Sequence, residues 1–271
     1  ALGFVLIYNA VGVVNFAQGE FVTIPAFIGL SFLTFAHFPW YLAYLLTLGA
    51  MVVFGLAFQF AAYYPLRNRT FLPVVISTIG ASILLQNVAQ LIWGASPLPF
   101  PSLFPPQQTI GLGGVHVVPQ HLLILAVTAV LLFAQFLLFE RTMLGKMMQA
   151  VAQDKDTARL LGVRAGVIIA VTFAYSAVLG GLGGILLGPI TFVSKDVGAS
   201  LALKAFSASI IGGFGSVQGA IVGGLILGLV EVFSASFLSP DYRDAYAFLV
   251  MIAVLLFRPQ GIFGEKVVER A

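Results

Sequence analysis

Residues 140–164, ERTMLGKMMQAVAQDKDTARLLGVR, determine how the rest of the chain is arranged. This stretch is rich in charge, whereas residues 70–139 before it and 165–194 after it contain no Lys, Arg, Asp or Glu. A polar island between two long apolar runs is typical of a water-exposed loop between membrane spans. Its excess of Lys and Arg over Asp and Glu places this central loop on the cytoplasmic side.

The central loop also has the pattern of short helices. Apolar residues recur at helical spacing at Leu144, Met147, Met148 and Val151. Asp154 or Asp156 can then cap a second short helix that ends at Gly162. Arg159 lies in the last turn of that helix, where the helix dipole favours a cation. A short amphipathic helix presented to the cytoplasm predicts a protein partner.

The composition excludes a soluble protein. Hydrophobic residues make up 60% of the 271 residues and charged residues only 8%, against about 25% in an ordinary domain. The mean hydropathy is +1.04. We therefore expect an all-α membrane protein, a polytopic helical bundle of about eight transmembrane segments forming one domain over residues 1–271. No basic patch alternates with aromatic residues, so the net charge of +3 does not indicate nucleic-acid binding.

The apolar runs predict where the segments lie. They are residues 2–14, 21–38, 41–64, 72–93, 121–139, 166–188, 202–211, 220–237 and 245–257. External loops are expected at 94–120 and 189–201, and a cytoplasmic tail at 258–271. The chain opens at Ala1 inside an apolar run, so the first span is expected to be incomplete.

Parity of the crossings constrains the last third of the chain. With the central loop and the tail both inside, an even number of crossings must separate them. Residues 202–237 must therefore enter and return, with the glycine-rich stretch 212–219 as the inner bend. Small residues at Gly180, Gly184 and Gly188, and at Gly219, Gly223, Gly224 and Gly228, predict close helix packing.

Two polar interruptions are candidates for the translocation pathway or its gate. One is the break at residues 15–20, and the other is the bend at 212–219. Irregular backbone at membrane depth is tolerated only where protein or a cavity covers it, and such breaks point to transport sites. A tight interfacial turn is the alternative at each position. The candidate residues are Asn15, Gln18, Glu20, Lys204, Gly213, Gly215, Gln218 and Glu231.

Three charges lie in or beside apolar sequence: Glu20, Lys204 and Glu231. A lone charge in the membrane is costly, so pairing is favourable. We expect Lys204 to pair with Glu20 or Glu231 and to hold the broken helices together. Snorkelling to an interface is the alternative for each of them.

Enzyme chemistry has no support in the sequence. The three histidines lie near span ends or in the external loop, without an HExxH motif, and cysteine is absent, so no metal site is expected. No GxxxxGK[ST] loop is present, so the chain binds no nucleotide itself. The run 213–216 is superficially similar to an intramembrane serine-protease loop, but no His lies at a matching depth in a later span.

Four stretches carry a resemblance to a known family. They are GVVNFAQGE (12–20), ERTMLGKMMQAVAQDKDTARLLGV (140–163), LGPITFVSKDVGASLALKAFSASIIGGFGSVQGAIVGG (187–224) and LLFRPQGIFG (255–264). Together they resemble the smaller of the two integral-membrane permeases of branched-chain amino-acid ABC importers. The resemblance implies translocation of Leu, Ile or Val across the bacterial inner membrane.

The resemblance also implies partners and a role for the central loop. Two cytoplasmic ATPase subunits would bind the ATP, and an external binding protein would recognise the substrate. A second permease subunit would lie beside this chain in the membrane, and lipid would surround both. The central loop would be the coupling helix that contacts an ATPase. Its expected contact residues are Gly145, Ala150, Asp154, Ala158, Arg159 and Gly162. The alternative is a self-sufficient secondary transporter or channel for a small solute such as urea or an amide, with Glu20 or Glu231 as an ion relay.

Overall fold

The structure is a computed structural model that describes residues 1–105, 109–112 and 115–264. Within these residues the chain is almost entirely helical, which confirms the all-α class. Residues 265–271, the end of the predicted tail, lie outside the described residues.

Within the described residues, the helices and strands follow one another without a soluble domain between them. They are α1 (Leu2–Val11), η1 (Phe16–Gly19), α2 (Glu20–Thr34), α3 (Trp40–Phe58), η2 (Gln59–Tyr63), η3 (Tyr64–Leu66), α4 (Phe71–Trp93), β1 (Ile110–Leu112), β2 (Val115–Val117), α5 (Pro119–Arg141), α6 (Met143–Gln153), α7 (Lys155–Leu160), α8 (Ala165–Thr191), α9 (Val197–Gly212), α10 (Val217–Phe237), η4 (Pro240–Tyr242) and α11 (Arg243–Phe257).

In the part of the chain that the structure describes, six helical stretches are long and apolar enough to cross a membrane. They are Phe16–Thr34, Trp40–Leu66, Phe71–Trp93, Pro119–Arg141, Ala165–Thr191 and Val217–Phe237. Two apolar helices, α1 and α9, are shorter. The polytopic class is therefore confirmed.

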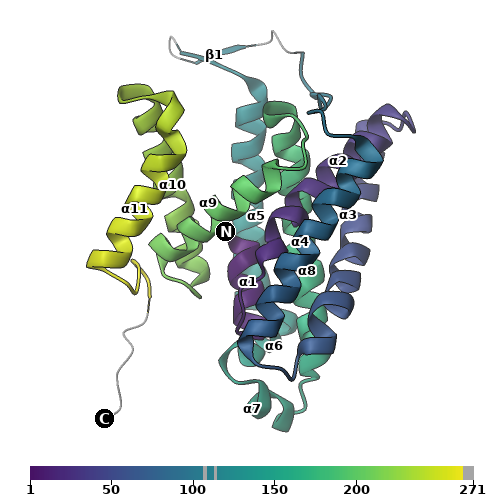
Figure 1. Cartoon of the computed structure of the whole chain (residues 1–271), viewed down its shortest axis with the longest axis vertical. Helices are drawn as coiled ribbons and strands as arrows, with labels where there is room; N and C mark the ends of the chain where they lie inside the picture. The colour runs from purple at the N-terminus through teal and green to yellow at the C-terminus, as the bar shows by residue number, and fades with distance from the viewer. Residues whose placement is uncertain (106–108, 113–114, 265–271) are drawn as a thin grey trace.

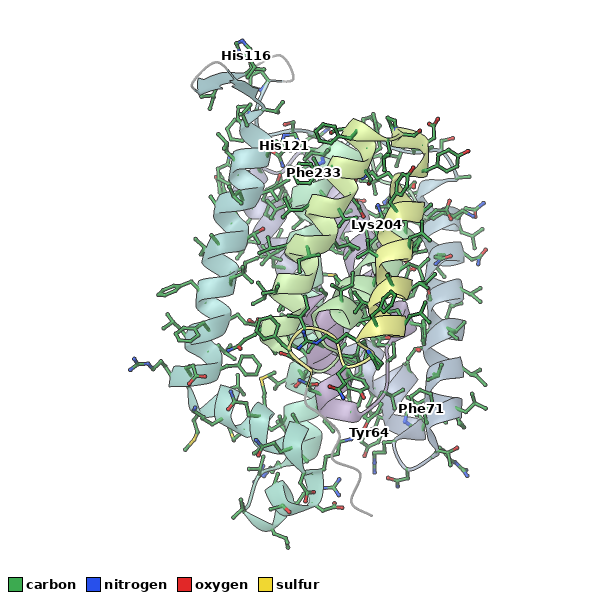
Figure 2. All side chains as sticks on the ribbon, turned by 90° about the vertical axis from the view of Figure 1, so that its left-hand side faces the viewer. Tyr64, Phe71, His116, His121, Lys204 and Phe233 are labelled. Carbon is green, nitrogen blue, oxygen red and sulfur yellow. The ribbon has the colours of Figure 1, made fainter. Side chains whose placement is uncertain are left out.

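The bundle has two distinct ends. Figure 1 shows α6 and α7 projecting at the bottom, and the antiparallel hairpin of β1 and β2 at the top. Figure 2 shows the same polarity, with His116 and His121 at one end and Tyr64 and Phe71 at the other. We call these the central-loop end and the hairpin end.

The predicted polar break is present between α1 and α2. α1 stops at Gly12, which has a φ of 75°, a conformation that glycine adopts without strain. Asn15 then accepts a hydrogen bond from the backbone N–H of Ala17 at 3.1 Å and starts the 3-10 turn η1. The chain reaches Glu20 already among other helices, so the break is covered by protein, as backbone at this depth requires.

Close packing around α8 holds the centre of the bundle. A Cβ on Gly180 or Gly184 would collide with the backbone carbonyls of Phe21 and Val22 in α2. These glycines therefore allow α2 to approach α8, as predicted. Among the described residues, nothing lies within 4 Å of a Cβ on Gly224 or Gly228 in α10, so the prediction of close packing within the chain is wrong there.

The predicted inner bend lies between α9 and α10, where Ser216 caps α10 through the N–H of Gly219 at 3.0 Å. The segment before α9 is shorter than the expected external loop 189–201. α8 continues through Pro189 to Thr191, and α9 already begins at Val197. The reason is burial: Gly198 lies against the backbone of Gly19, and a helix satisfies the polar groups of a buried backbone.

Candidate functional site

Glu20 lies buried at the start of α2, facing the middle of α4. Its Oε1 accepts hydrogen bonds from Ser82 Oγ at 3.1 Å and Gln86 Nε2 at 2.9 Å. Its Oε2 has no partner within the described residues. The carboxyl therefore pairs with neutral groups of α4 and not with Lys204, so Glu20 is not the partner in the expected pair of Lys204 with Glu20 or Glu231. The other polar residues of the break are anchored nearby, with Gln18 donating to Ser176 Oγ at 3.1 Å.

Lys204 pairs with Glu231, which confirms the expectation of a pair with Glu20 or Glu231, and two further charged residues join this pair. Lys204 Nζ lies 3.2 Å from Glu231 Oε1 and 2.7 Å from Asp244 Oδ1. Arg243 Nη2 lies 2.7 Å from Glu231 Oε2. These four residues, which we call the charge quartet, join α9, α10 and α11. Figure 2 shows Lys204 in the upper half of the bundle, toward the hairpin end.

The glycine bend is held by two other parts of the chain. Gly213 and Gly215 have φ values of 109° and 95°, in the region that favours glycine. The side chain of Asn9 donates to the carbonyl of Gly215 at 2.8 Å. The backbone N–H groups of Ile262 and Phe263 donate to Ile211 and Gly212 at 3.1 and 2.8 Å. The bend is therefore tied to α1 and to the segment after α11.

The central loop folds as α6 and α7, in agreement with the sequence. Thr142 caps α6 through the N–H of Gly145 at 3.1 Å. Asp154 caps α7, and its acceptance of hydrogen bonds from Thr157 and Asp156 holds its pKa below the usual range. Gly162, with a φ of 85°, follows the end of α7. Arg159 lies in the last turn, 2.9 Å from Asp156.

The expected contact residues of the central loop divide into supporting and exposed positions. Gly145 packs against the backbone of Leu138 and Phe139, and Ala158 is buried. Asp154, Arg159 and Gly162 face outward. The sequence did not single out Leu160 and Leu161, which are 88% and 77% exposed at the tip of the loop. Apolar side chains exposed at a polar tip are the signal that could have found them.

Lys155 connects the central loop to the transmembrane bundle. Its Nζ donates to the carbonyl of Val11, the last residue of α1, at 3.0 Å. Burial, with the nearby charge of Arg159, lowers the pKa of Lys155. α7 is therefore attached directly to the helix that leads into the polar break.

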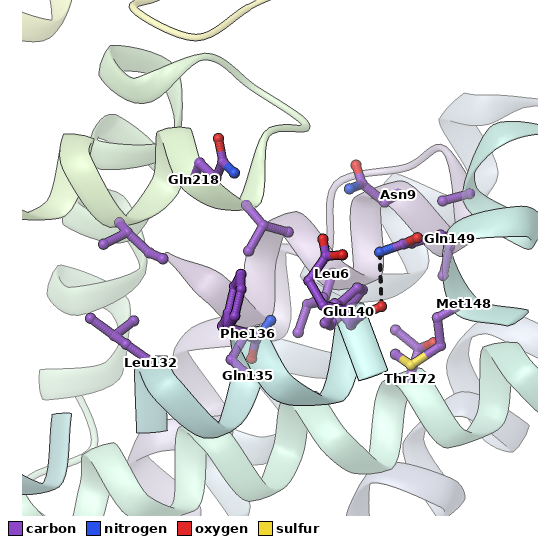
Figure 3. A pocket seen from close by; sticks show the side chains of 15 residues that line it. Leu6, Asn9, Leu132, Gln135, Phe136, Glu140, Met148, Gln149, Thr172 and Gln218 are labelled. Carbon is purple, nitrogen blue, oxygen red and sulfur yellow. Dashed lines mark hydrogen bonds between the residues drawn. The ribbon is translucent and has the colours of Figure 1, made fainter. Parts of the chain in front are cut away.

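A cavity of about 240 Å³ lies between α5 and the helices α1, α6, α8 and α10 (Figure 3). Of the candidate pathway residues, Gln218 lines it. The remaining candidates belong to the break, the bend and the charge quartet, so the structure does not gather them into one site. Among the described residues, no group of three His, Asp or Glu side chains could hold a metal ion.

A polytopic bundle with broken helices, a buried polar break and a capped helix pair at one end is the architecture of a membrane transport protein. A family model described as "Branched-chain amino acid transport system / permease component" matches residues 1–255. The chain belongs to this family.

Individual proteins that are similar to the chain carry names that agree with this family assignment. The chain is 35% identical to the high-affinity branched-chain amino acid transport system permease protein BraD of Pseudomonas aeruginosa, and 34% identical to the corresponding permease LivH of Escherichia coli. Both alignments cover 100% of this chain and 92% of the relative. The autoinducer 2 import permease LsrC of Yersinia enterocolitica is 31% identical over 47% of this chain. No solved structure matches the chain.

The family and the six apolar helices make the chain a multi-pass protein of the inner membrane and a permease component of a transport system. They favour an importer subunit over the self-sufficient transporter or channel.

Proposed function

We propose that the chain carries branched-chain amino acids across the membrane as one permease of an ABC importer driven by separate ATPase subunits. Full-length similarity to BraD and LivH supports this substrate class. A second permease, two ATPases and an external binding protein would complete the assembly. The chain itself hydrolyses nothing in this proposal, and ATP acts through the ATPase subunits.

The single observation that carries the coupling role is the tip of α7. Leu160 and Leu161 are exposed beside Arg159, on a helix whose start is fixed by a cap and whose first residue is bonded to α1. An exposed apolar tip with an adjacent cation suits a groove on a cytoplasmic ATPase. Closure of the ATPases would then move α7 and, through Lys155, the transmembrane helices.

The pathway is proposed to run past the polar break. Glu20, Ser82 and Gln86 place polar groups at the middle of α4, whose remaining surface is largely exposed. A second permease covering α4 would enclose these groups between the two subunits. An amino acid would then move past these polar groups between the two subunits, shielded from the lipid.

The coupling proposal is tested by reversing charge at the tip. Arg159→Glu should abolish stimulation of the ATPase and uptake of radiolabelled leucine. The new carboxylate would repel Asp156, and it would replace the cation that the groove of the partner is proposed to bind. Arg69→Glu, an exposed charge reversal in another loop at the same end, should leave both near wild type. Leu160→Ser should also reduce stimulation, since it removes apolar contact without changing charge. Unchanged stimulation in both tip variants would contradict the assignment.

A further inference from the structure

The cavity in Figure 3 has the features of a binding site, and none of residues 15–20 of the polar break lines it. Its walls come from α1, α5, α6, α8 and α10, and it contains both polar and apolar side chains. Glu140 and Gln149, from α5 and α6, place one side of the cavity at the central-loop end. The site therefore lies where an importer releases its cargo.

One hydrogen-bond donor in this cavity is buried and unused. Gln135 is 2% exposed, and its Oε1 accepts the hydroxyl of Tyr175 at 2.8 Å. That bond fixes the amide. Gln135 lines the cavity, and its buried Nε2 has no partner among the described residues. A buried donor without an acceptor is costly, so a ligand that supplies an acceptor is favoured.

Two residues in the wall of the cavity, Asn9 and Gln149, can accept hydrogen bonds through their amide oxygens. The amide nitrogen of Asn9 is used by the carbonyl of Gly215 at 2.8 Å, which leaves its Oδ1 free to accept. The amide nitrogen of Gln149 is used by the carbonyl of Phe139 at 3.3 Å, which leaves its Oε1 free. Glu140 also lines the cavity, and its half-exposed carboxylate lies 3.7 Å from Lys146 Nζ. The site thus offers a donor for an anion and several acceptors for a cation.

The rest of the wall is apolar. Leu6, Leu132, Phe136 and Ile221 line it. The cavity, of about 240 Å³, is large enough to hold several waters or one small organic molecule. Valine, leucine and isoleucine are small molecules that carry an ammonium, a carboxylate and an aliphatic chain.

We propose that this cavity binds one aliphatic amino-acid zwitterion on the release side of the permease, an inference that rests on the proposed function. The carboxylate accepts from Gln135 Nε2, the ammonium donates to Asn9, Gln149 or Glu140, and the side chain packs against the apolar wall. An acyl chain of a lipid would fit the apolar wall but would leave Gln135 without an acceptor. Because Gln149 belongs to α6, the bound amino acid touches the central loop directly.

Equilibrium binding of tritiated L-leucine to the purified permease–ATPase complex, without the external binding protein and without ATP, tests this site. Wild type should bind leucine saturably. L-Leucinol, which lacks the carboxylate, and 4-methylpentanoate, which lacks the ammonium, should compete poorly. Gln135→Leu should weaken leucine binding about tenfold or more. Leu132→Trp, which fills the cavity from the apolar side, should abolish it.

The matched control is Gln120→Leu, because Gln120 is also a buried glutamine of α5 but bonds to Leu186 outside the cavity. It should bind leucine as wild type does. The proposal is overturned if Gln135→Leu and Leu132→Trp bind leucine normally, or if a phospholipid occupies the site and leucine does not displace it. A wild-type complex that imports leucine but binds none in this assay overturns this inference alone. One that neither imports nor binds leucine overturns the proposed function as well.

Discussion

Asp154 controls the start of α7 through three hydrogen bonds. Its Oδ1 accepts from the N–H groups of Asp156 at 2.9 Å and Thr157 at 3.3 Å, and its Oδ2 accepts from the Thr157 hydroxyl at 2.6 Å. These bonds favour the charged form and lower the pKa of Asp154 in the folded chain. The stabilisation is therefore present above the unfolded pKa, about 3.9, and is lost as pH falls through the lower folded value.

We predict that the protection factors of the α7 amides, which are exchange rates corrected for the intrinsic effect of pH, fall at acid pH in wild type. Asp154→Ala should show low protection factors at every pH, because the cap is gone. Asp154→Asn should keep high protection factors that do not change with pH, since Asn caps helices without titrating. Protection factors in α6, which Thr142 caps, serve as the internal control. An Asn variant whose protection factors fall at acid pH as in wild type would show that another group titrates.

Glu231 is the central residue of the charge quartet. It contacts both Lys204 and Arg243, whereas Lys204 also has Asp244. Glu231→Gln should therefore destabilise the complex by about 3 kcal/mol, because it leaves two cations with one partly exposed carboxylate. Lys204→Met should destabilise the complex clearly less, since Glu231 would still be paired with Arg243. Thermal unfolding of the detergent-solubilised complex measures both. Equal losses would mean that the quartet acts only through the Lys204–Glu231 contact.

The quartet also shows what the sequence could and could not predict about single residues. The pair of Lys204 with Glu231 was predictable because an unpaired charge in an apolar segment is costly. The contacts of Arg243 and Asp244 could not be predicted. Their side chains reach Glu231 and Lys204 from the first turn of α11, whereas the apolar pattern predicted a span that begins only at residue 245. Likewise, Ser82 and Gln86 were visible as polar residues of α4, but their bond to Glu20 depends on tertiary packing.

At the scale of elements, α8 offers a direct test of close packing. Gly180→Ala should destabilise the bundle by about 1–3 kcal/mol, because its Cβ would meet the carbonyl oxygen of Phe21 and force α2 away. Gly183→Ala, three residues further along the same helix, should be near neutral, since nothing lies within 4 Å of its Cβ. Fluorescence-detected size-exclusion chromatography after heating compares them. Equal effects of the two substitutions on stability would indicate that helix propensity, and not the contact with Phe21, determines the change.

Hydropathy predicted the elements well and their internal irregularities poorly. Long apolar runs identify spans because the bilayer requires them. The π-helical turn η2, at Gln59–Tyr63, leaves no mark on hydropathy, although it continues the third span to Leu66. The early start of α9 was missed because residues 189–201, which include the charged Lys195 and Asp196, were expected to form an external loop. The central loop was predictable in detail because capping residues act locally.

At the scale of the whole molecule, α1 links the features that sequence analysis treated separately. Its last carbonyl, on Val11, holds Lys155 of the central loop. Asn9 holds the glycine bend through Gly215, and the chain after Gly12 enters the polar break that ends at Glu20. A displacement of α7 can therefore reach both candidate gates through one short helix. This is a contiguous physical route with named contacts.

The route predicts a variant that separates docking from transmission. Lys155→Met removes the bond to Val11 but leaves Arg159, Leu160 and Leu161 at the tip of α7. The ATPases should still co-purify and hydrolyse ATP, because the docking surface is intact, whereas leucine uptake per ATP hydrolysed should fall severalfold. Arg159→Glu should instead lose stimulation and uptake together. Ratios of uptake to hydrolysis in proteoliposomes distinguish the two. If Lys155→Met keeps the wild-type ratio, force passes from α7 to the membrane through α6 and α8, and the bond to α1 only stabilises the fold.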